Sequence, residues 1–247
     1  MKGKLRTPKT MLRKSILLCL VAGLAPVAGA ATVSINFVGR GGANGTLFPD
    51  EVAGVVPAAN WNNVRPDNEF GINYASGALV DETGATTTTT VAWTNIGPYF
   101  INTGTGTPNN VMFNGYLDNF AEVRTLTISG LSAGQVYQVY LYSDGDNGTN
   151  SRTGFFTMGG VTTGITDGPG NFDGTFVGVA PGTTGVGNYT VFTLTGATSY
   201  DLTFHGTTAD DLPRAALNGM QIVPVPEPAA ALLGLAGLLP LLRRRRN

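Results

Sequence analysis

The stretch Ile128-Ser129-Gly130-Leu131-Ser132-Ala133-Gly134-Gln135-Val136-Tyr137 carries the most informative local pattern of the chain and leads into a predicted strand over Gln135 to Tyr142. Gly and Ser between two apolar runs are typical of a turn that joins strands. In the strand, alternation places Tyr137, Val139 and Leu141 on one face, which we expect to be the core face. Gln138, Tyr140 and Tyr142 are then expected on the opposite face.

The spacing L-x-x-G-x-x-Y from Leu131 to Tyr137 resembles the tyrosine corner of β-sandwich domains. That resemblance implies that the Tyr137 hydroxyl bonds back to the preceding turn. The aromatic pair Tyr140 and Tyr142 leaves two interpretations open. The rings pack against a second layer or neighbouring strands, or they form a flat platform for sugar rings.

The rest of residues 31–223 also predicts short strands, because it is rich in Gly, Thr, Asn and Val and shows no long helical periodicity. The strand candidates before the turn are Thr32–Phe37, Thr86–Trp93, Val111–Tyr116 and Val123–Ile128. Further candidates follow at Thr153–Met158, Gly174–Val179, Tyr189–Leu194, Tyr200–His205 and Leu217–Val223. Pro57 to Gly77 is expected to be a long ordered loop, in which Trp61 either fills the core or stacks on a glycan. We therefore predict an all-β fold, a jelly-roll-like β-sandwich over residues 31–223.

The N-terminus predicts export. Residues 1–14 carry six basic side chains and no acid, Ser15 to Val27 is mostly apolar, and Ala28-Gly29-Ala30 is an A-x-A cleavage site. Residues 1–30 are therefore predicted to be a signal peptide removed by signal peptidase after Ala30, with Met1 or Met11 as the start. Cys19 is the only cysteine and leaves with this segment, so disulfides and cysteine chemistry are excluded from the mature chain.

The C-terminus, residues 224–247, predicts a sorting signal. Val225-Pro226-Glu227-Pro228 precedes the apolar run Ala229 to Leu242, and Arg243-Arg244-Arg245-Arg246 follows it. The apolar run predicts a helix of about 21 Å, a short transmembrane span whose arginines would remain in the cytoplasm. The order of these parts resembles the PEP-CTERM sorting signal, which implies an exosortase as partner and a transient or retained position in the inner membrane. It also implies delivery to the cell surface or an extracellular polysaccharide matrix.

The charge of the exported part is strongly negative. Between Ala31 and Pro228 the sequence holds five arginines, no lysine and all sixteen acids, which leaves it about eleven charges negative. Such a surface lacks the basic patch that nucleic acid or anionic lipid would need. We therefore expect no nucleic-acid partner.

The search for catalytic residues finds little. His205 is the only histidine, and nothing in the sequence orients it as the base of a Ser-His-Asp triad. Asp144, Asp146, Asp210 and Asp211 offer carboxylates for glycoside cleavage, but an acidic chain supplies such pairs by chance. Gly148 occupies the fifth position of the Asp144 segment, where a calcium loop needs an oxygen ligand, so a plain turn is expected. The sequence predicts no catalytic residue, no metal site, no cofactor and no enzyme.

A second resemblance rests on looser patterns. Ile35-Asn36-Phe37-Val38, the segment Gly54 to Asn63, and Leu217-Asn218-Gly219-Met220-Gln221-Ile222-Val223 are similar to the galactose-binding-like jelly rolls that often precede PEP-CTERM tails. This implies that the first and last strands lie near each other. The resulting prediction is a non-catalytic surface or matrix protein associated with exopolysaccharide. The alternatives are a carbohydrate-binding module, with Trp61, Tyr140 and Tyr142 as candidate contacts, and a glycan-acting hydrolase.

Overall fold

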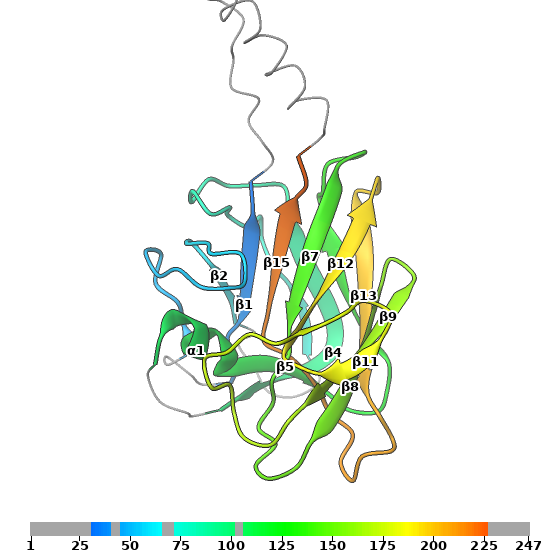
Figure 1. Cartoon of the computed structure of the whole chain (residues 1–247). Helices are drawn as coiled ribbons and strands as arrows, with labels where there is room; N and C mark the ends of the chain where they lie inside the picture. Colours follow the sequence, from blue (N-terminus) through cyan, green and yellow to red (C-terminus); the bar gives the residue numbers. More distant parts are fainter. Residues whose placement is uncertain (1–30, 41–44, 66–71, 102–105, 227–247) are drawn as a thin grey trace, which may run out of the picture.

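The computed structural model describes residues 31–40, 45–65, 72–101 and 106–226 of the 247-residue chain. These residues form fifteen strands and one short helix (Figure 1). The elements in the first half are β1 (Val33–Phe37), β2 (Asn62–Val64), β3 (Ile72–Ala75), β4 (Thr90–Phe100), α1 (Pro108–Phe113), β5 (Gly115–Asn119), β6 (Arg124–Ser129) and β7 (Val136–Tyr142). Those in the second half are β8 (Arg152–Met158), β9 (Val161–Asp167), β10 (Gly178–Val179), β11 (Thr184–Val186), β12 (Tyr189–Thr195), β13 (Ser199–Gly206), β14 (Ala215–Leu217) and β15 (Gly219–Pro224).

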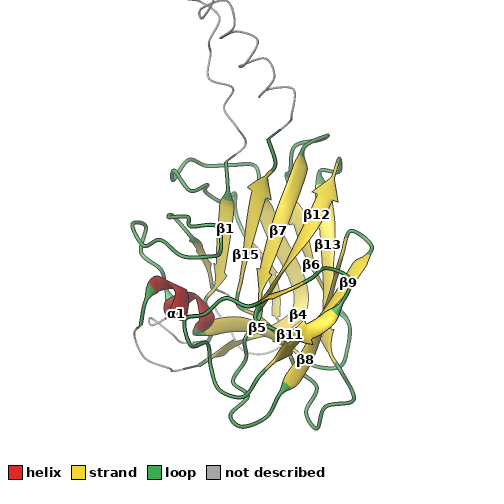
Figure 2. Ribbon diagram, viewed as in Figure 1, coloured by secondary structure: helices red, strands yellow, loops and turns green. Residues whose placement is uncertain are grey.

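The strands form two sheets that pack face to face (Figure 2). One sheet has six strands in the order β10-β12-β7-β15-β1-β2. The other has nine, in the order β11-β9-β8-β13-β6-β4-β5-β14, with β3 paired to β4. The predicted all-β sandwich is confirmed.

Strand β7 lies in the middle of the six-stranded sheet, between β12 and β15. The predicted core face of β7 is confirmed, because Tyr137, Val139 and Leu141 are buried in the main core between the sheets. The opposite face carries Tyr140 and Tyr142, which belong to a second apolar cluster. One strand therefore supplies side chains to two separate cores.

The turn before β7 has the geometry of a tyrosine corner. The Tyr137 hydroxyl accepts a hydrogen bond from the backbone N–H of Ser132 at 3.0 Å. Gly130 is required here, because its φ is +80° and a Cβ would lie 1.9 Å from the Thr88 carbonyl oxygen. The turn thus fixes both the start of β7 and its approach to the segment before β4.

The second cluster covers the outer face of the six-stranded sheet, and we call it the outer cluster. Its buried members are Leu47, Ala53, Trp61, Val111, Met112, Phe113, Tyr142 and Phe172. Tyr142 belongs to β7 of the sheet itself, and the others come from the segment before β2, from α1 and from the segment after β9, all of which fold over the sheet. This face is therefore packed against protein.

Helix α1 replaces part of the strand that the sequence predicted over Val111–Tyr116, so that prediction is wrong. The Thr107 side chain accepts from the Asn110 backbone N–H at the helix start, and Pro108 occupies the first turn. A capping threonine followed by proline favours a helix start over a strand. Strand β5 then begins at Gly115.

The first and last strands are neighbours, as Val33 of β1 pairs with Ile222 of β15. Both ends of the described domain therefore leave the sandwich at the same end, which is uppermost in Figure 1. Loop 143–151 and the connection between β13 and β14 extend from the opposite end. We call these two regions the terminal end and the distal end.

Candidate functional site

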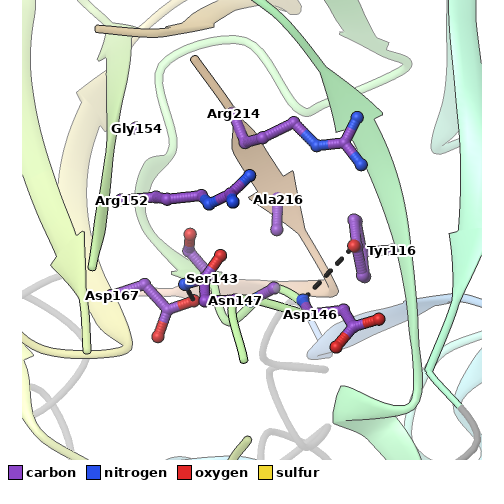
Figure 3. A pocket seen from close by; sticks show the side chains of 10 residues that line it. Tyr116, Ser143, Asp146, Asn147, Arg152, Gly154, Asp167, Arg214 and Ala216 are labelled. Carbon is purple, nitrogen blue, oxygen red and sulfur yellow. Dashed lines mark hydrogen bonds between the residues drawn. The ribbon is translucent and has the colours of Figure 1, made fainter. Parts of the chain in front are cut away.

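The distal end holds a group of charged and polar side chains that we call the polar cluster. Its members are Tyr116, Asp118, Asp144, Asn147, Arg152, Asp167 and Arg214, most of which line or adjoin one small cavity (Figure 3). They come from β5, loop 143–151, β8, β9 and the residue before β14. Five separate segments thus meet where the apolar core between the sheets ends.

Asp167 ends β9 and joins two segments. Its Oδ2 accepts hydrogen bonds from the Gly145 backbone N–H at 2.6 Å and from the Asn147 side-chain amide at 2.5 Å. Burial and the neighbouring Asp144 carboxyl raise the pKa of Asp167 to about 8, although these hydrogen bonds and Arg152 oppose the shift. Burial and the Asp144 carboxyl thus favour the protonated form of Asp167.

Asp144 follows β7 and is only 5% exposed. Its backbone N–H donates to the Asn218 side-chain oxygen at 2.7 Å, which fixes the chain direction after the strand. Its carboxyl Oδ1 is buried and has no hydrogen-bond partner within the described ranges. Burial raises the pKa of Asp144 to about 7, against a hydrogen bond from the Phe172 backbone N–H that lowers it, and the Asp173 carboxyl adds to the rise.

Asp118 on β5 forms an ion pair with Arg214, whose Nη1 lies 2.9 Å from the Asp118 Oδ2. Burial raises the pKa of Asp118 to about 6, even though Arg214 and Arg152 both favour its charged form. The Arg214 guanidinium also lies over the Phe120 ring, 4.6 Å from its centroid. Arg214 thus connects a buried carboxylate to an exposed aromatic ring.

The cavity between these groups is small. Its free space is about 10 Å³, which is room for about one water molecule. The Tyr116 hydroxyl at its wall accepts from the Asp146 backbone N–H at 3.3 Å, and burial raises the pKa of that hydroxyl. A sugar ring cannot enter, whereas one water molecule or one small cation can.

Two of the three residues proposed from sequence as glycan contacts do not lie on the surface. Trp61 is 4% exposed and Tyr142 is fully buried, both in the outer cluster. The Trp61 indole N–H donates to the Ala58 carbonyl, and the Tyr142 hydroxyl contacts Gln221 and the Val55 N–H. Tyr140 is half-buried against the same cluster. Of the two interpretations left open by the sequence, the structure shows packing against a second layer, because three chain segments fold across this face.

The carboxylates proposed from sequence separate in the structure. Asp144 and Asp146 lie in loop 143–151 at the polar cluster. Asp210 instead accepts from the Thr153 backbone N–H at 2.7 Å, and Asp211 is exposed. His205 packs beside Phe155, with ring centroids 5.6 Å apart.

Sequence reasoning missed Asp118, Asp167, Arg152 and Arg214. The sequence holds a usable signal, because residues 31–228 have only five basic side chains and Arg152 and Arg214 are two of them. Each of the four residues also lies at or next to a strand end. Within the described ranges, no three acidic, histidine or cysteine side chains are arranged to hold a metal ion together.

Most residues of the predicted sorting and processing signals lie outside the described residues, namely Ala28, Ala30, Glu227, Pro228 and Arg243 to Arg246. Val225 is described, and its N–H donates to the Val136 carbonyl at 2.8 Å. Its own carbonyl accepts from the Gln135 side chain at 2.7 Å. The motif therefore begins directly beside β7, with Pro226 as the last described residue. In the ranges that the structure covers, no helix combines the length and apolar character needed to cross a membrane.

No family model and no curated protein matches the chain. Among solved structures, the YxiM protein of Bacillus subtilis matches with a TM-score of 0.41 and 13% identity, over 78% of this chain and 40% of that one. An exo-beta-1,3-galactanase from Phanerochaete chrysosporium, in complex with galactose, matches with a TM-score of 0.28 and 15% identity, over 53% of this chain and 32% of that one. The same enzyme with beta-1,3-galactotriose gives a TM-score of 0.27 and 17% identity, over 44% and 23%.

The chain thus spans less than half of each matched chain. Carbohydrate-related proteins are present among its structural neighbours. The prediction that the chain is not an enzyme is corrected, because a named glycoside-cleaving enzyme is among these matches and the exclusion of catalysis does not stand. At TM-scores below 0.5 the matches assign no activity to this chain.

Proposed function

We propose that this chain is an exported protein that an exosortase sorts to the cell surface or the extracellular matrix, where its distal end contacts exopolysaccharide. The observation that carries the proposal is the position of the polar cluster relative to the chain ends. β15 leads directly into the sorting motif at the terminal end, whereas the cluster lies at the other end of β7. Seven strand residues at about 3.3 Å each separate these ends by roughly 23 Å.

This arrangement suits a tethered binding protein. A tail held in the inner membrane would keep the terminal end close to the bilayer and direct the distal end away from it. The excess of acids over arginines in the exported part favours a well-solvated surface. The distal end, which carries the polar cluster, would then be the end that contacts extracellular material.

Phe120 is the side chain that we assign to glycan contact. Its ring is 45% exposed and is supported from one side by the Arg214 guanidinium. Sugar recognition commonly combines one aromatic face with a few polar groups, and the polar cluster supplies those groups beside this ring. A sugar ring would lie on the surface against Phe120, because the cavity itself is too small for it.

Replacement of Pro226, Glu227 and Pro228 by Ala tests the sorting part. The variant should still be exported but should remain in the inner-membrane fraction, because the apolar run and arginines would halt transfer without a recognised motif. Fractionation of the native host checks this, with the exposed Asp211→Ala as control. Release equal to that of the wild type would contradict exosortase sorting.

Binding of the purified chain to the host's own exopolysaccharide tests the contact. Phe120→Ala should weaken binding by roughly tenfold, since one stacked ring contributes about 1–1.5 kcal/mol. Val123→Ala is the matched control, as Val123 is an exposed apolar residue after the same strand, at 60% exposure. Equal binding by both variants would show that the glycan contact does not involve Phe120. Release of reducing ends during the assay would identify the chain as a hydrolase.

A further inference from the structure

The two segments around Asp144 and Asp167 are fixed to each other. Besides the two bonds to the Asp167 carboxylate, the Gly170 backbone N–H donates to the Gly148 carbonyl at 2.8 Å. The Asn110 side chain donates to the Phe172 carbonyl at 3.2 Å, which links the second segment to α1. Loop 143–151 and the segment after β9 therefore form one preorganised unit.

The charges inside this unit do not balance. Asp144 and Asp167 are 5% and 8% exposed. Arg214 is paired with Asp118, and Arg152 favours the charged forms of both Asp118 and Asp167. The charged neighbours of Asp144 are instead two other acids, Asp167 and Asp173. The sequence has no lysine after residue 14 that could take this role. Within the described residues, neither ion pair involves Asp144, so a cation from solution can take this position.

The buried Oδ1 of Asp144 marks where such a cation would bind. This oxygen has no partner among the described residues, and a buried carboxylate oxygen without a donor is strongly unfavourable. At a site with no charged groups, a water molecule could supply the hydrogen bond that such an oxygen lacks. Here two carboxyl groups lie near each other, and their negative charge favours a cation instead.

We infer that Asp144 and Asp167 bind one calcium ion together with neutral oxygens of loop 143–151. The ligands on offer are oxygens, with no histidine or cysteine in the unit, which disfavours zinc. Because no three acidic side chains converge within the described ranges, amide and backbone carbonyl oxygens and water must complete the shell. Calcium accepts six to eight such oxygens in irregular geometry, whereas magnesium requires a compact octahedron. The Asn147 side chain is 5% exposed beside Asp167 and is the nearest neutral candidate.

Thermal unfolding of the full chain, first in chelator and then with calcium chloride, tests this site. A hundredfold excess of calcium over its Kd should raise the unfolding temperature by roughly 5–10 °C, and equal magnesium chloride should raise it less. Titration calorimetry should show one ion per chain. Asp144→Asn should abolish the shift, whereas Asp211→Asn, which removes an exposed carboxylate, should retain it.

The Asp144→Asn variant should remain folded, because it removes a repulsive charge rather than a packed group. In chelator its unfolding temperature should equal or exceed that of the wild type. An unchanged wild type on addition of calcium, or an equal calcium shift in Asp144→Asn, would overturn the proposal. Neither result depends on export, sorting or glycan binding, so the proposed function would be unaffected.

Discussion

The terminal and distal ends of the sandwich are built from different interactions. At the terminal end, the tyrosine corner joins neutral groups, with one hydroxyl that accepts one backbone N–H beside apolar side chains. At the distal end, the polar cluster includes three buried aspartates and two arginines, and Asp167, Arg152 and Arg214 line a cavity of about 10 Å³. Buried charges rarely add net stability, whereas strongly shifted pKa values gather at functional sites. The tyrosine corner that stabilises the fold and the polar cluster with its shifted pKa values therefore lie at opposite ends of β7.

The largest expected effect comes from the terminal end. Tyr137→Ala removes a ring that is 5% exposed together with its hydrogen bond to Ser132. The free energy of unfolding should fall by roughly 3–5 kcal/mol, whereas Tyr137→Phe should cost only about 1 kcal/mol. Urea unfolding of both variants measures the difference. A loss below 1 kcal/mol for Tyr137→Ala would show that the corner does not hold the terminal end.

A smaller effect should come from the ion pair at the distal end. Arg214→Met leaves the Asp118 carboxylate buried without its partner, which should cost roughly 2–4 kcal/mol. The double change Arg214→Met with Asp118→Asn should recover much of this loss, because the unpaired charge is gone. Urea unfolding of the single and double variants at pH 8 checks the recovery. Equal losses in both would mean that packing, and not charge, dominates this end.

The last expected effect is a pH dependence, in which the stability of the folded protein falls as pH rises. The folded pKa values of Asp118, Asp144 and Asp167 are raised to about 6, 7 and 8 from a usual 3.8. The folded state therefore binds more protons than the unfolded state between about pH 4 and pH 8. The stability that these groups contribute is fully present below that window and is lost as pH rises through the folded pKa values.

In chelator, the unfolding temperature should accordingly fall from pH 5 to pH 8. Asp167→Asn should flatten this dependence, while Asp211→Asn should leave it unchanged. Calorimetry across this pH range provides the measurement. A wild type that becomes more stable toward pH 8 would show that Arg152 and Arg214 outweigh burial at the distal end.

The terminal end was largely predictable from sequence, and the distal end was not. The alternation of β7 and the Leu131 to Tyr137 spacing are local patterns, and local patterns are visible in one stretch of sequence. The pairing of Asp144 with Asp167 depends on two segments that no local pattern brings together. The burial of Tyr142 likewise depends on the segments around Leu47 and Phe113, which cover a face that alternation alone leaves open.

The pairing of β1 with β15 also sets an order of events for a chain that crosses a membrane from its N-terminus. Ser34 and Gln221 are 187 residues apart and share a hydrogen bond of 3.1 Å. The middle of the six-stranded sheet, where β15 lies between β7 and β1, stays incomplete until nearly the whole domain has emerged. Such distant contacts fold slowly, because a long loop must close before they form. If the chain is exported as proposed, it would therefore cross as an open polypeptide, and its last strand would pair only when the predicted sorting motif reaches the membrane.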